Sequence, residues 1–392
     1  MHKRKHSAHP NHEIHFLARE INGWLPEGIQ STIEGNYTPR HLRRYYFSDE
    51  TVDQLHVSDR IMQHLLLQQL KPTFTHVINP NCVHLHGPSG VKLATQRVRR
   101  ALADTNPQYI IRADIKSFYR SILHHKLLLD LKQYYHDPKL LAMLERVITN
   151  PIETPRGYKN PHHGIALRGP LSQFFSAIYL KKLDDAFLSA EVTYIRYQDD
   201  VLILCKSKTQ MNRCRRRMME ILQERGLSLS RRKTRIGSIQ ENFHFLGVQY
   251  EGTQPHRYIT VSHSAHDAII EPDNPAAILA IQGGRPLDDQ QSAPHRIVPH
   301  ARTLRKARVQ VQLMIADQFS TAFIKNYLHR WTKWWSITVD SWQYHILLQQ
   351  FLDKCWDHNT AAYARSLLQH RVREGCTRSQ SASRETRDCK AA

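Results

Sequence analysis

A short apolar stretch with two adjacent carboxylates near its centre constrains this fold more than any other feature. Residues 194–204 read Tyr-Ile-Arg-Tyr-Gln-Asp-Asp-Val-Leu-Ile-Leu, which predicts a strand, a tight turn and a second strand. Asp is depleted in strands and neighbouring like charges repel. A divalent cation such as Mg²⁺ would remove that repulsion, because it binds hard oxygen ligands. For Asp199 and Asp200 taken alone, a solvated turn is the alternative explanation.

A third carboxylate follows another apolar strand pattern. Residues 108–114 predict a strand that ends on Asp114, and Phe118 and Tyr119 come directly after it. A turn Asp beside core aromatics is the alternative here. Carboxylates from two strands can hold two Mg²⁺ ions roughly 3.5–4 Å apart, which suits phosphoryl transfer from a nucleoside triphosphate to a 3′-hydroxyl. Mn²⁺ is an alternative to Mg²⁺ at such a site.

A second adjacent pair, Asp184 and Asp185, has a different context. It lies at the end of the helical pattern over 174–180 rather than between two strands. We therefore interpret this pair as solvated charge at a helix terminus rather than as a metal site.

The composition points to a polyanionic partner. Among 392 residues, 55 Lys and Arg oppose 35 Asp and Glu, giving a net charge of +20, which favours nucleic acid as the ligand. The six Cys form no C-x-x-C pair, so neither a zinc nor a redox motif is predicted, and a reducing cytoplasm fits best. The chain has no apolar run of roughly eighteen residues, so we expect no membrane span and no signal peptide.

Periodicity predicts a mixture of helices and strands, that is, an α+β fold. The expected helices begin at Val57 and cover 93–103, 124–149, 174–180, 211–222 with Gly226 as its cap, and 300–370. The expected strands are 108–114, the hairpin at 194–204, 227–236, and 243–250, the last closing the same sheet. Residues 79–92 are expected to form a loop, and residues 150–163 a polar loop.

These patterns divide the chain into five expected segments. They are a loosely ordered basic N-terminal arm at 1–56, a central region at 57–252, a loop-rich connector at 253–299, a helical region at 300–370 and a disordered basic tail at 371–392.

Five motifs in order resemble those of reverse transcriptases. Residues 111–119 resemble the first catalytic motif of that family, and Tyr197-Gln198-Asp199-Asp200 resembles its Y-x-D-D box. Residues 171–180 resemble the intervening motif, while Lys233-Thr234 and residues 245–247 resemble the two that follow. The resemblance is to bacterial enzymes of the group II intron and diversity-generating retroelement types. It implies a right-hand polymerase with fingers, a palm of antiparallel sheet carrying the hairpin, and a helical thumb after residue 300.

The resemblance also implies roles for individual residues. Asp114, Asp199, Asp200 and the backbone carbonyl of Ile115 would bind two Mg²⁺ ions. Tyr119 would be a steric gate that stacks under the deoxyribose and excludes a 2′-hydroxyl.

Other roles implied by the resemblance concern the substrate. Lys233 would approach the triphosphate and act as general acid on pyrophosphate. Ser172, Gln173 and Gln198 would contact the nascent base pair, and Arg60 and Lys92 would be fingertip cations on the incoming phosphates.

Three functional hypotheses follow. The first is an RNA-directed DNA polymerase that extends a DNA or RNA primer with dNTPs on an RNA template, in a bacterial retroelement or an antiviral defence system. The second is a maturase-like RNA-binding protein in which polymerisation is secondary. The third, an RNA-directed RNA polymerase, is opposed by Tyr119. No H-N-H, zinc or RNase H pattern is visible, so strand cutting and template removal would need accessory proteins.

Overall fold

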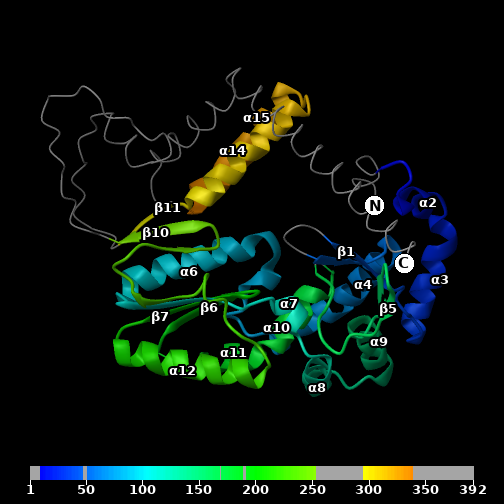
Figure 1. Ribbon diagram of the computed structural model, residues 1–392, viewed down its shortest axis with the longest axis horizontal. Coiled ribbons are helices and arrows are strands. Elements are labelled where there is room, and N and C mark those ends of the chain that lie inside the picture. Colours follow the sequence, from blue (N-terminus) through cyan, green and yellow to red (C-terminus); the bar gives the residue numbers. More distant parts are fainter. Residues whose placement is uncertain (1–8, 47–50, 168, 189–190, 253–294, 339–392) are drawn as a thin grey trace, which may run out of the picture. The chain divides into compact units, whose positions relative to one another are not determined.

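The chain divides into two compact units. The computed structural model describes residues 9–46, 51–167, 169–188, 191–252 and 295–338. One unit comprises residues 1–101 and 107–239, and the other residues 102–106 and 240–392. Helices and strands are mixed along the chain, as expected for an α+β fold (Figure 1).

The first unit begins with helices where a loosely ordered arm was predicted. Helices α2 (Glu13–Arg19) and α3 (Ile21–Glu34) pack against α4 (Val57–Leu70). Ile14 and Leu17 of α2 are buried. The prediction of a loosely ordered arm is therefore wrong for residues 9–40, because they contain two helices and because Ile14, Leu17 and Tyr37 are buried.

A four-stranded sheet follows, in the order β2-β1-β4-β5. Its strands are β1 (Leu42–Tyr46), β2 (Thr51–Gln54), β4 (Ile152–Thr154) and β5 (Gly157–Lys159). Strands β4 and β5 occupy the predicted polar loop at 150–163, so that prediction is wrong. The strand signal is weak because all three residues of β5 are exposed, and Gly157 turns the chain with a φ of +105°.

The central sheet carries the predicted hairpin and has the order β6-β7-β3-β8, with every pair antiparallel. Its strands are β3 (Tyr109–Asp114), β6 (Thr193–Tyr197), β7 (Asp200–Cys205) and β8 (Arg235–Ser238). The hairpin and the strand before it are thus confirmed, whereas the strand predicted at 227–236 begins only at Arg235. Strand β3 lies inside the sheet, because β7 and β8 pair with its two edges.

Helices cover both sides of this sheet (Figure 1). On one face, Ile111, Ala113, Val201 and Ile203 belong to the main hydrophobic core. Helix α12 (Lys208–Glu224) packs there against β3 and β7, and α6 (Gly90–Thr105) lies on the other side in Figure 1. Gly226 ends the α12 segment with a φ of +74°, which confirms the predicted cap.

The remaining helices of the first unit are short. They are η1 (Lys71–Thr73), α5 (Phe74–Val77), η2 (Val83–Ser89), α7 (Phe118–Ser121), α8 (His124–Tyr134), α9 (Pro138–Ile148), α10 (Ser172–Tyr179) and α11 (Lys181–Ala186).

The second unit contains its own sheet, with the order β11-β10-β9. Its strands are β9 (Phe243–Phe245), β10 (Val248–Gly252) and β11 (His295–Pro299). Residues 243–250 therefore do not close the central sheet, and that prediction is wrong. Leu246 and Gly247 have φ values of +50° and +83°, so the chain turns there and β9 pairs with β10 instead.

Two helices follow β11 in the second unit. They are α14 (Ala301–Ala316) and α15 (Thr321–Thr338), which confirm the predicted helical pattern as far as residue 338. The predicted connector from 253 to 294, the helical pattern beyond 338 and the predicted tail at 371–392 lie outside the described residues. In the part of the chain that the structure describes, no helix has the length and apolar character of a membrane span.

Candidate active site

The three candidate carboxylates meet where β3 ends and the hairpin turns. Asp114 and Asp200 are directly opposed in the β3–β7 register. The backbone N–H of Ile115 donates to the carbonyl of Asp199 at 3.2 Å. The backbone hydrogen bond here thus joins the residues that flank Asp114 and Asp200, which form a non-hydrogen-bonded pair. In such a pair the two side chains share one face of the sheet, with Cβ atoms about 4.5–5.5 Å apart. The structure therefore brings together the carboxylates that the sequence predicted.

The charges at this site favour a cation. Burial raises the pKa of Asp199, and burial together with the charge of Asp199 raises the pKa of Asp200 to about 6. Lys233 Nζ lies 3.1 Å from Asp114 Oδ2, so the structure also brings this predicted cation to the carboxylates. Among the described residues, no three His, Cys, Asp or Glu already stand in a metal-holding arrangement. The donor chemistry nevertheless fits Mg²⁺, because three partly buried carboxylates gather at one point.

One predicted metal ligand, the backbone carbonyl of Ile115, is compatible with the hydrogen bonds of the backbone beside Asp114. Ile115 forms an isolated antiparallel bridge with Leu229. The hydrogen bonds of that bridge run from Ser230 N–H to the Asp114 carbonyl at 2.8 Å and from Lys116 N–H to the Ser228 carbonyl at 2.8 Å. The hydrogen bonds of this bridge therefore do not involve the Ile115 carbonyl, which stays a predicted metal ligand.

Tyr119 lies in α7, directly beyond the carboxylates. Ser117, with a φ of +48°, turns the chain from β3 into this helix. Burial raises the pKa of Tyr119 to about 12, and the charge of Asp199 also raises it. The Tyr119 ring packs against the main hydrophobic core, and its role as a gate residue stays a prediction.

The two residues that begin α10 differ in exposure. Ser172 is only 5% exposed, and its hydroxyl donates to the Ala166 carbonyl at 2.5 Å. A Cβ at Gly169 would lie 2.6 Å from this hydroxyl, so the turn before α10 requires glycine. Because Ser172 is engaged within the protein, the exposed Gln173 is the member of the pair that can meet a substrate.

Arg60 and Lys92 occupy the first turns of α4 and α6. The N-cap of α4 is His56. Asp59 is 3% exposed and accepts hydrogen bonds from the Tyr37 hydroxyl and the Arg40 N–H. The roles of Arg60 and Lys92 as phosphate-binding cations stay predictions.

Asp184 and Asp185 were predicted to be solvated, and the structure corrects this for Asp184. Its side chain is fully buried and forms an ion pair with Arg196 at 2.5 Å. Asp185 is exposed and pairs with Lys181 at 2.7 Å, as predicted for a helix terminus. The sequence did contain a signal, because Arg196 is a cation inside an apolar strand.

The turn of the hairpin is supported by His84, a residue that no sequence pattern singled out. Gln198 has a φ of +56°, and its N–H donates to Nδ1 of His84 at 3.2 Å. His84 is 2% exposed, and burial lowers its pKa to about 3. A single sequence offers no periodicity that would identify this histidine as buried.

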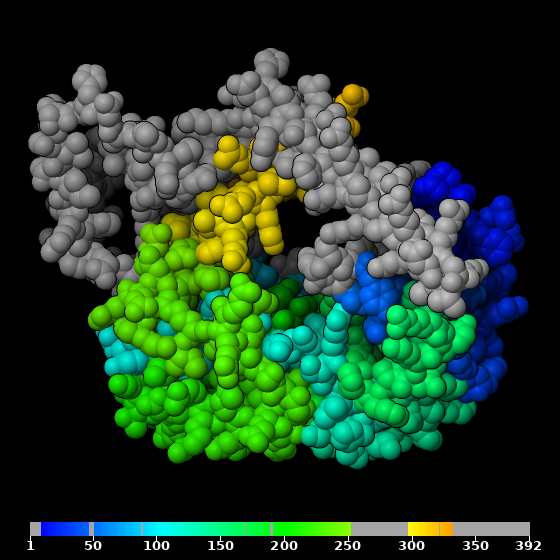
Figure 2. All heavy atoms as spheres, in the orientation of Figure 1, coloured from blue at the N-terminus to red at the C-terminus, as the bar shows by residue number. Residues whose placement is uncertain are grey.

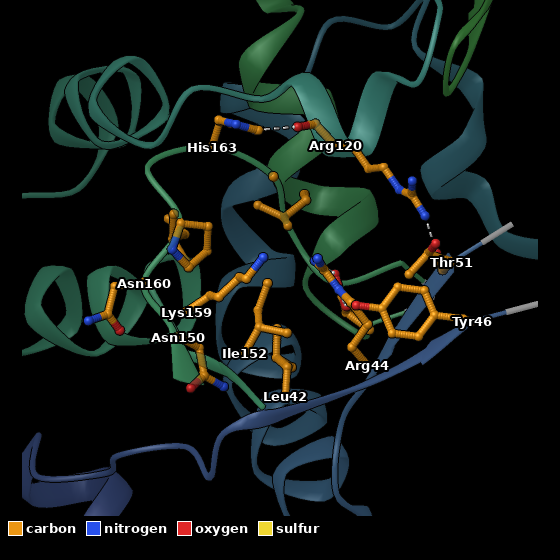
Figure 3. Close-up of a pocket in the computed structure, with 15 residues that line it drawn as sticks. Leu42, Arg44, Tyr46, Thr51, Arg120, Asn150, Ile152, Lys159, Asn160 and His163 are labelled. Atoms are coloured by element: carbon orange, nitrogen blue, oxygen red, sulfur yellow. Dashed lines mark hydrogen bonds and ion pairs between the residues drawn. The ribbon is translucent and has the colours of Figure 1, made fainter. Parts of the chain in front are cut away.

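A basic cavity of about 540 Å³ lies among β1, β2 and the residues after β5. Figure 3 shows Lys159, Arg44 and Arg120 at its lining. Arg44 is held by Asp53 through contacts of 2.6 and 2.9 Å, and Arg120 donates to the Thr51 carbonyl at 2.5 Å. Arg44 and Arg120 are held in place by these contacts, so the cavity is a preformed basic surface.

Comparison with known families and proteins agrees with this geometry. Residues 51–250, just over half of the chain, match the family described as Reverse transcriptase (RNA-dependent DNA polymerase). Protein YkfC of Escherichia coli (strain K12) is 22% identical over 258 residues, which cover 55% of this chain and 68% of that protein.

Two telomerase structures also resemble the chain. Telomerase from Candida albicans, in complex with a TWJ fragment of telomeric RNA, is 15% identical with a TM-score of 0.39, covering 49% of this chain and 36% of the telomerase. Apo telomerase from Candida tropicalis, truncated from its C-terminal domain, is 14% identical with a TM-score of 0.40, covering 48% and 43%. The chain thus spans less than half the length of these telomerases. Family membership implies the right-hand polymerase fold, and on the match over residues 51–250 the chain belongs to the reverse transcriptase (RNA-dependent DNA polymerase) family.

Proposed function

We propose that this chain extends a DNA or RNA primer with dNTPs on an RNA template. The observation that carries the proposal is the direct opposition of Asp114 and Asp200, with Asp199 adjacent and Lys233 in contact with Asp114. Family membership supports RNA-directed DNA synthesis in general. The carboxylate site supports nucleotidyl transfer as the chemistry at that point.

The residues of the chain have distinct parts in the proposed mechanism. Asp114, Asp199, Asp200 and the Ile115 carbonyl would hold two Mg²⁺ ions. When bound, these ions supply activation of the primer 3′-hydroxyl and neutralisation of the leaving pyrophosphate. Lys233 has a side chain that is 64% exposed, so its ammonium can move from Asp114 to the leaving phosphate and donate a proton from Nζ.

Other groups would select and hold the substrate. The Tyr119 ring would stack under the sugar of the incoming nucleotide, where a 2′-hydroxyl would collide with it. The cavity lined by Arg120 and Lys159 has the charge needed for backbone phosphates of the template.

The first prediction tests the carboxylates by primer extension on an RNA template with dNTPs and Mg²⁺. The double change Asp199→Asn, Asp200→Asn should reduce the extension rate by about a thousandfold or more, because both ions lose ligands. Glu220→Gln is the matched control, since it removes an exposed carboxylate on α12 whose ion-pair partner among the described residues is the exposed Arg217 at 3.7 Å. Extension by the double variant at the wild-type rate would refute the proposal.

RNA retention is the second candidate function, and helix α12 favours it. Its apolar side faces the core, whereas Arg213, Arg215, Arg216 and Arg217 are exposed. Figure 2 shows this part of the chain at the outer surface of the molecule. Such a surface suits the backbone of a structured RNA. If the double Asp variant keeps the full biological activity, RNA retention is the main function.

We further propose that the chain serves a bacterial retroelement or a defence system. The support is the resemblance of Ser172-Gln173 to the diversity-generating type and of Arg168-Gly169 to bacterial group II-like enzymes, together with the bacterial relative. Sequencing the RNA that copurifies with the chain tests this directly, because a retroelement enzyme should retain the RNA of its own element.

A further inference from the structure

Gln198 holds an unfavourable backbone conformation at the turn that carries both Asp residues. Its φ of +56° lies in the left-handed region, which is disfavoured by about tenfold in population for a residue with a Cβ. The residue after it is Asp199, so any relaxation of this φ and ψ redirects the carboxylates. Contacts from other segments must therefore keep the turn in place.

His84 holds the peptide group before the Gln198 Cα. Its Nδ1 accepts the Gln198 N–H at 3.2 Å. Its Nε2 lies 2.9 Å from the Gln173 carbonyl and 3.2 Å from the Ser176 hydroxyl. Because Nδ1 must accept a hydrogen bond, the imidazole is neutral with its proton on Nε2. The histidine thus spans from the start of α10 to the catalytic turn.

Arg196 holds the peptide group after the Gln198 Cα. Its Nη1 donates to the Gln198 carbonyl at 3.0 Å. The guanidinium has no exposed surface, and Asp184 accepts from it at 2.6 and 2.5 Å. Asp184 also accepts from the Tyr194 hydroxyl at 2.7 Å. This bidentate pairing fixes the plane of the guanidinium, so the group has no freedom to follow the turn if the turn moves.

Together these contacts determine both torsion angles of Gln198. One more contact, from the Ile115 N–H to the Asp199 carbonyl, holds the next peptide group. If the ion pair of Arg196 and Asp184 had only a structural role, Arg196 would need no hydrogen bond to the backbone of Gln198. Here His84 and Arg196 each direct one polar atom to the same residue, and that residue precedes the carboxylates.

We propose that His84 and Arg196, with Asp184 behind Arg196, are positioning residues that set the direction of Asp199 and Asp200. The inference rests on the proposed function, because it assumes that these carboxylates bind the catalytic cations. None of the three touches the substrate in this scheme. They act through the backbone of Gln198.

An isosteric pair of substitutions at residue 84 tests the proposal. In His84→Asn, the Oδ1 atom can take the place of Nδ1 and accept the Gln198 N–H, whereas His84→Leu has the same shape and no acceptor. Both variants lose the contact with Gln173. We expect His84→Leu to lower kcat for primer extension by about tenfold, the cost of an unsupported left-handed residue, and His84→Asn to keep most of it.

Two measurements separate positioning from a general loss of structure. Mn²⁺ binding, followed by electron paramagnetic resonance, should weaken several-fold in His84→Leu but not in His84→Asn. The Kd for template–primer and the urea midpoint should be similar for both variants. His86→Leu is the matched control, because His86 is exposed two residues along the chain, and it should behave as wild type in every measurement.

A second-site change probes the left-handed residue itself. Glycine adopts positive φ without penalty, so Gln198→Gly should restore part of the kcat and the Mn²⁺ affinity lost in His84→Leu. Arg196→Lys keeps the charge beside Asp184 but loses the planar fork, and should show the same pattern of defects as His84→Leu.

The outcomes distinguish this inference from the proposed function. Equal kcat and equal Mn²⁺ affinity in His84→Leu and His84→Asn would overturn the positioning role. Absence of extension by the wild type would refute the proposed function, while a difference in Mn²⁺ affinity between the two variants would still support positioning. No restoration by Gln198→Gly would show that His84 does not act through this torsion.

Discussion

At the scale of single residues, the ring of Tyr119 offers a direct test of substrate choice. Tyr119 follows Asp114 by five positions in the sequence, and the charge of Asp199 contributes to its raised pKa. Tyr119→Ala removes the ring, so the relative use of rNTPs over dNTPs should rise by about tenfold or more as the clash with a 2′-hydroxyl disappears. Single-nucleotide extension with matched dNTP and rNTP measures this ratio.

Tyr119→Phe is the control for that prediction. It keeps the ring and loses only the hydroxyl, so discrimination should stay close to that of the wild type. If Phe and Ala relax discrimination equally, the hydroxyl is responsible rather than the bulk of the ring. Unchanged discrimination in Tyr119→Ala would show that residue 119 is not the gate.

At the scale of elements, the ion pair of Arg196 and Asp184 joins β6 to α11. Asp184 raises the pKa of Arg196 well above its usual value, although burial opposes the charge. Arg196→Met leaves an uncompensated buried carboxylate and should lower the free energy of unfolding by about 3–5 kcal/mol. Adding Asp184→Leu should recover most of this loss, because an apolar pair then fills the site. Urea unfolding of both variants measures the difference.

The control for the ion pair lies one residue away. Asp185→Asn removes the charge of a side chain that is 42% exposed and keeps an oxygen that can accept from Asn79, so it should change the unfolding free energy by less than about 1 kcal/mol. Arg196→Met with wild-type stability would mean that water or another group compensates Asp184.

Elements with a strong period were predictable from the sequence, and those defined by their partners were not. Strand β3, the hairpin and α12 each carry continuous apolar positions that periodicity detects. Strands β4 and β5 have only three residues each, and they form because β4 pairs with β1 and β5 pairs with β4. The alternation over 243–250 identified a strand but could not say which sheet it joins.

The candidate site shows the same division. Asp114, Asp199 and Asp200 are polar residues in apolar patterns, which is a local signal. Whether Asp184 is buried depends on Arg196, twelve positions away, and on how two elements pack. His84 lies in a segment without periodicity, and its contact with Gln198 spans 114 positions. Local patterns hold no information about such distant pairs.

At the scale of the whole molecule, the net charge of +20 predicts salt-dependent binding of RNA. Each phosphate contact adds roughly 0.7–0.9 to the slope of log K against log salt. The double change Arg213→Gln, Arg216→Gln on α12 should therefore lower the magnitude of the slope by about 1.4–1.8 if this surface holds RNA. Fluorescence anisotropy of a labelled structured RNA over a salt series measures the slope.

The control for this surface removes the same charge elsewhere. Lys132→Gln, Lys139→Gln changes exposed residues of α8 and α9, and its slope should equal that of the wild type. An equal fall in slope for both double variants would indicate a general effect of charge. An unchanged slope in the α12 variant would exclude α12 as the RNA surface.

The support of the catalytic turn has a consequence for synthesis of the chain on the ribosome. His84 and Asp184 both precede the turn in the sequence, so the groups that hold Gln198 have already emerged when the turn follows them. Lys233 and β8, which complete the other side of β3, follow only after α12. The turn can thus take its strained conformation once β7 has emerged behind it and paired with β6, while the lysine that contacts Asp114 is added afterwards.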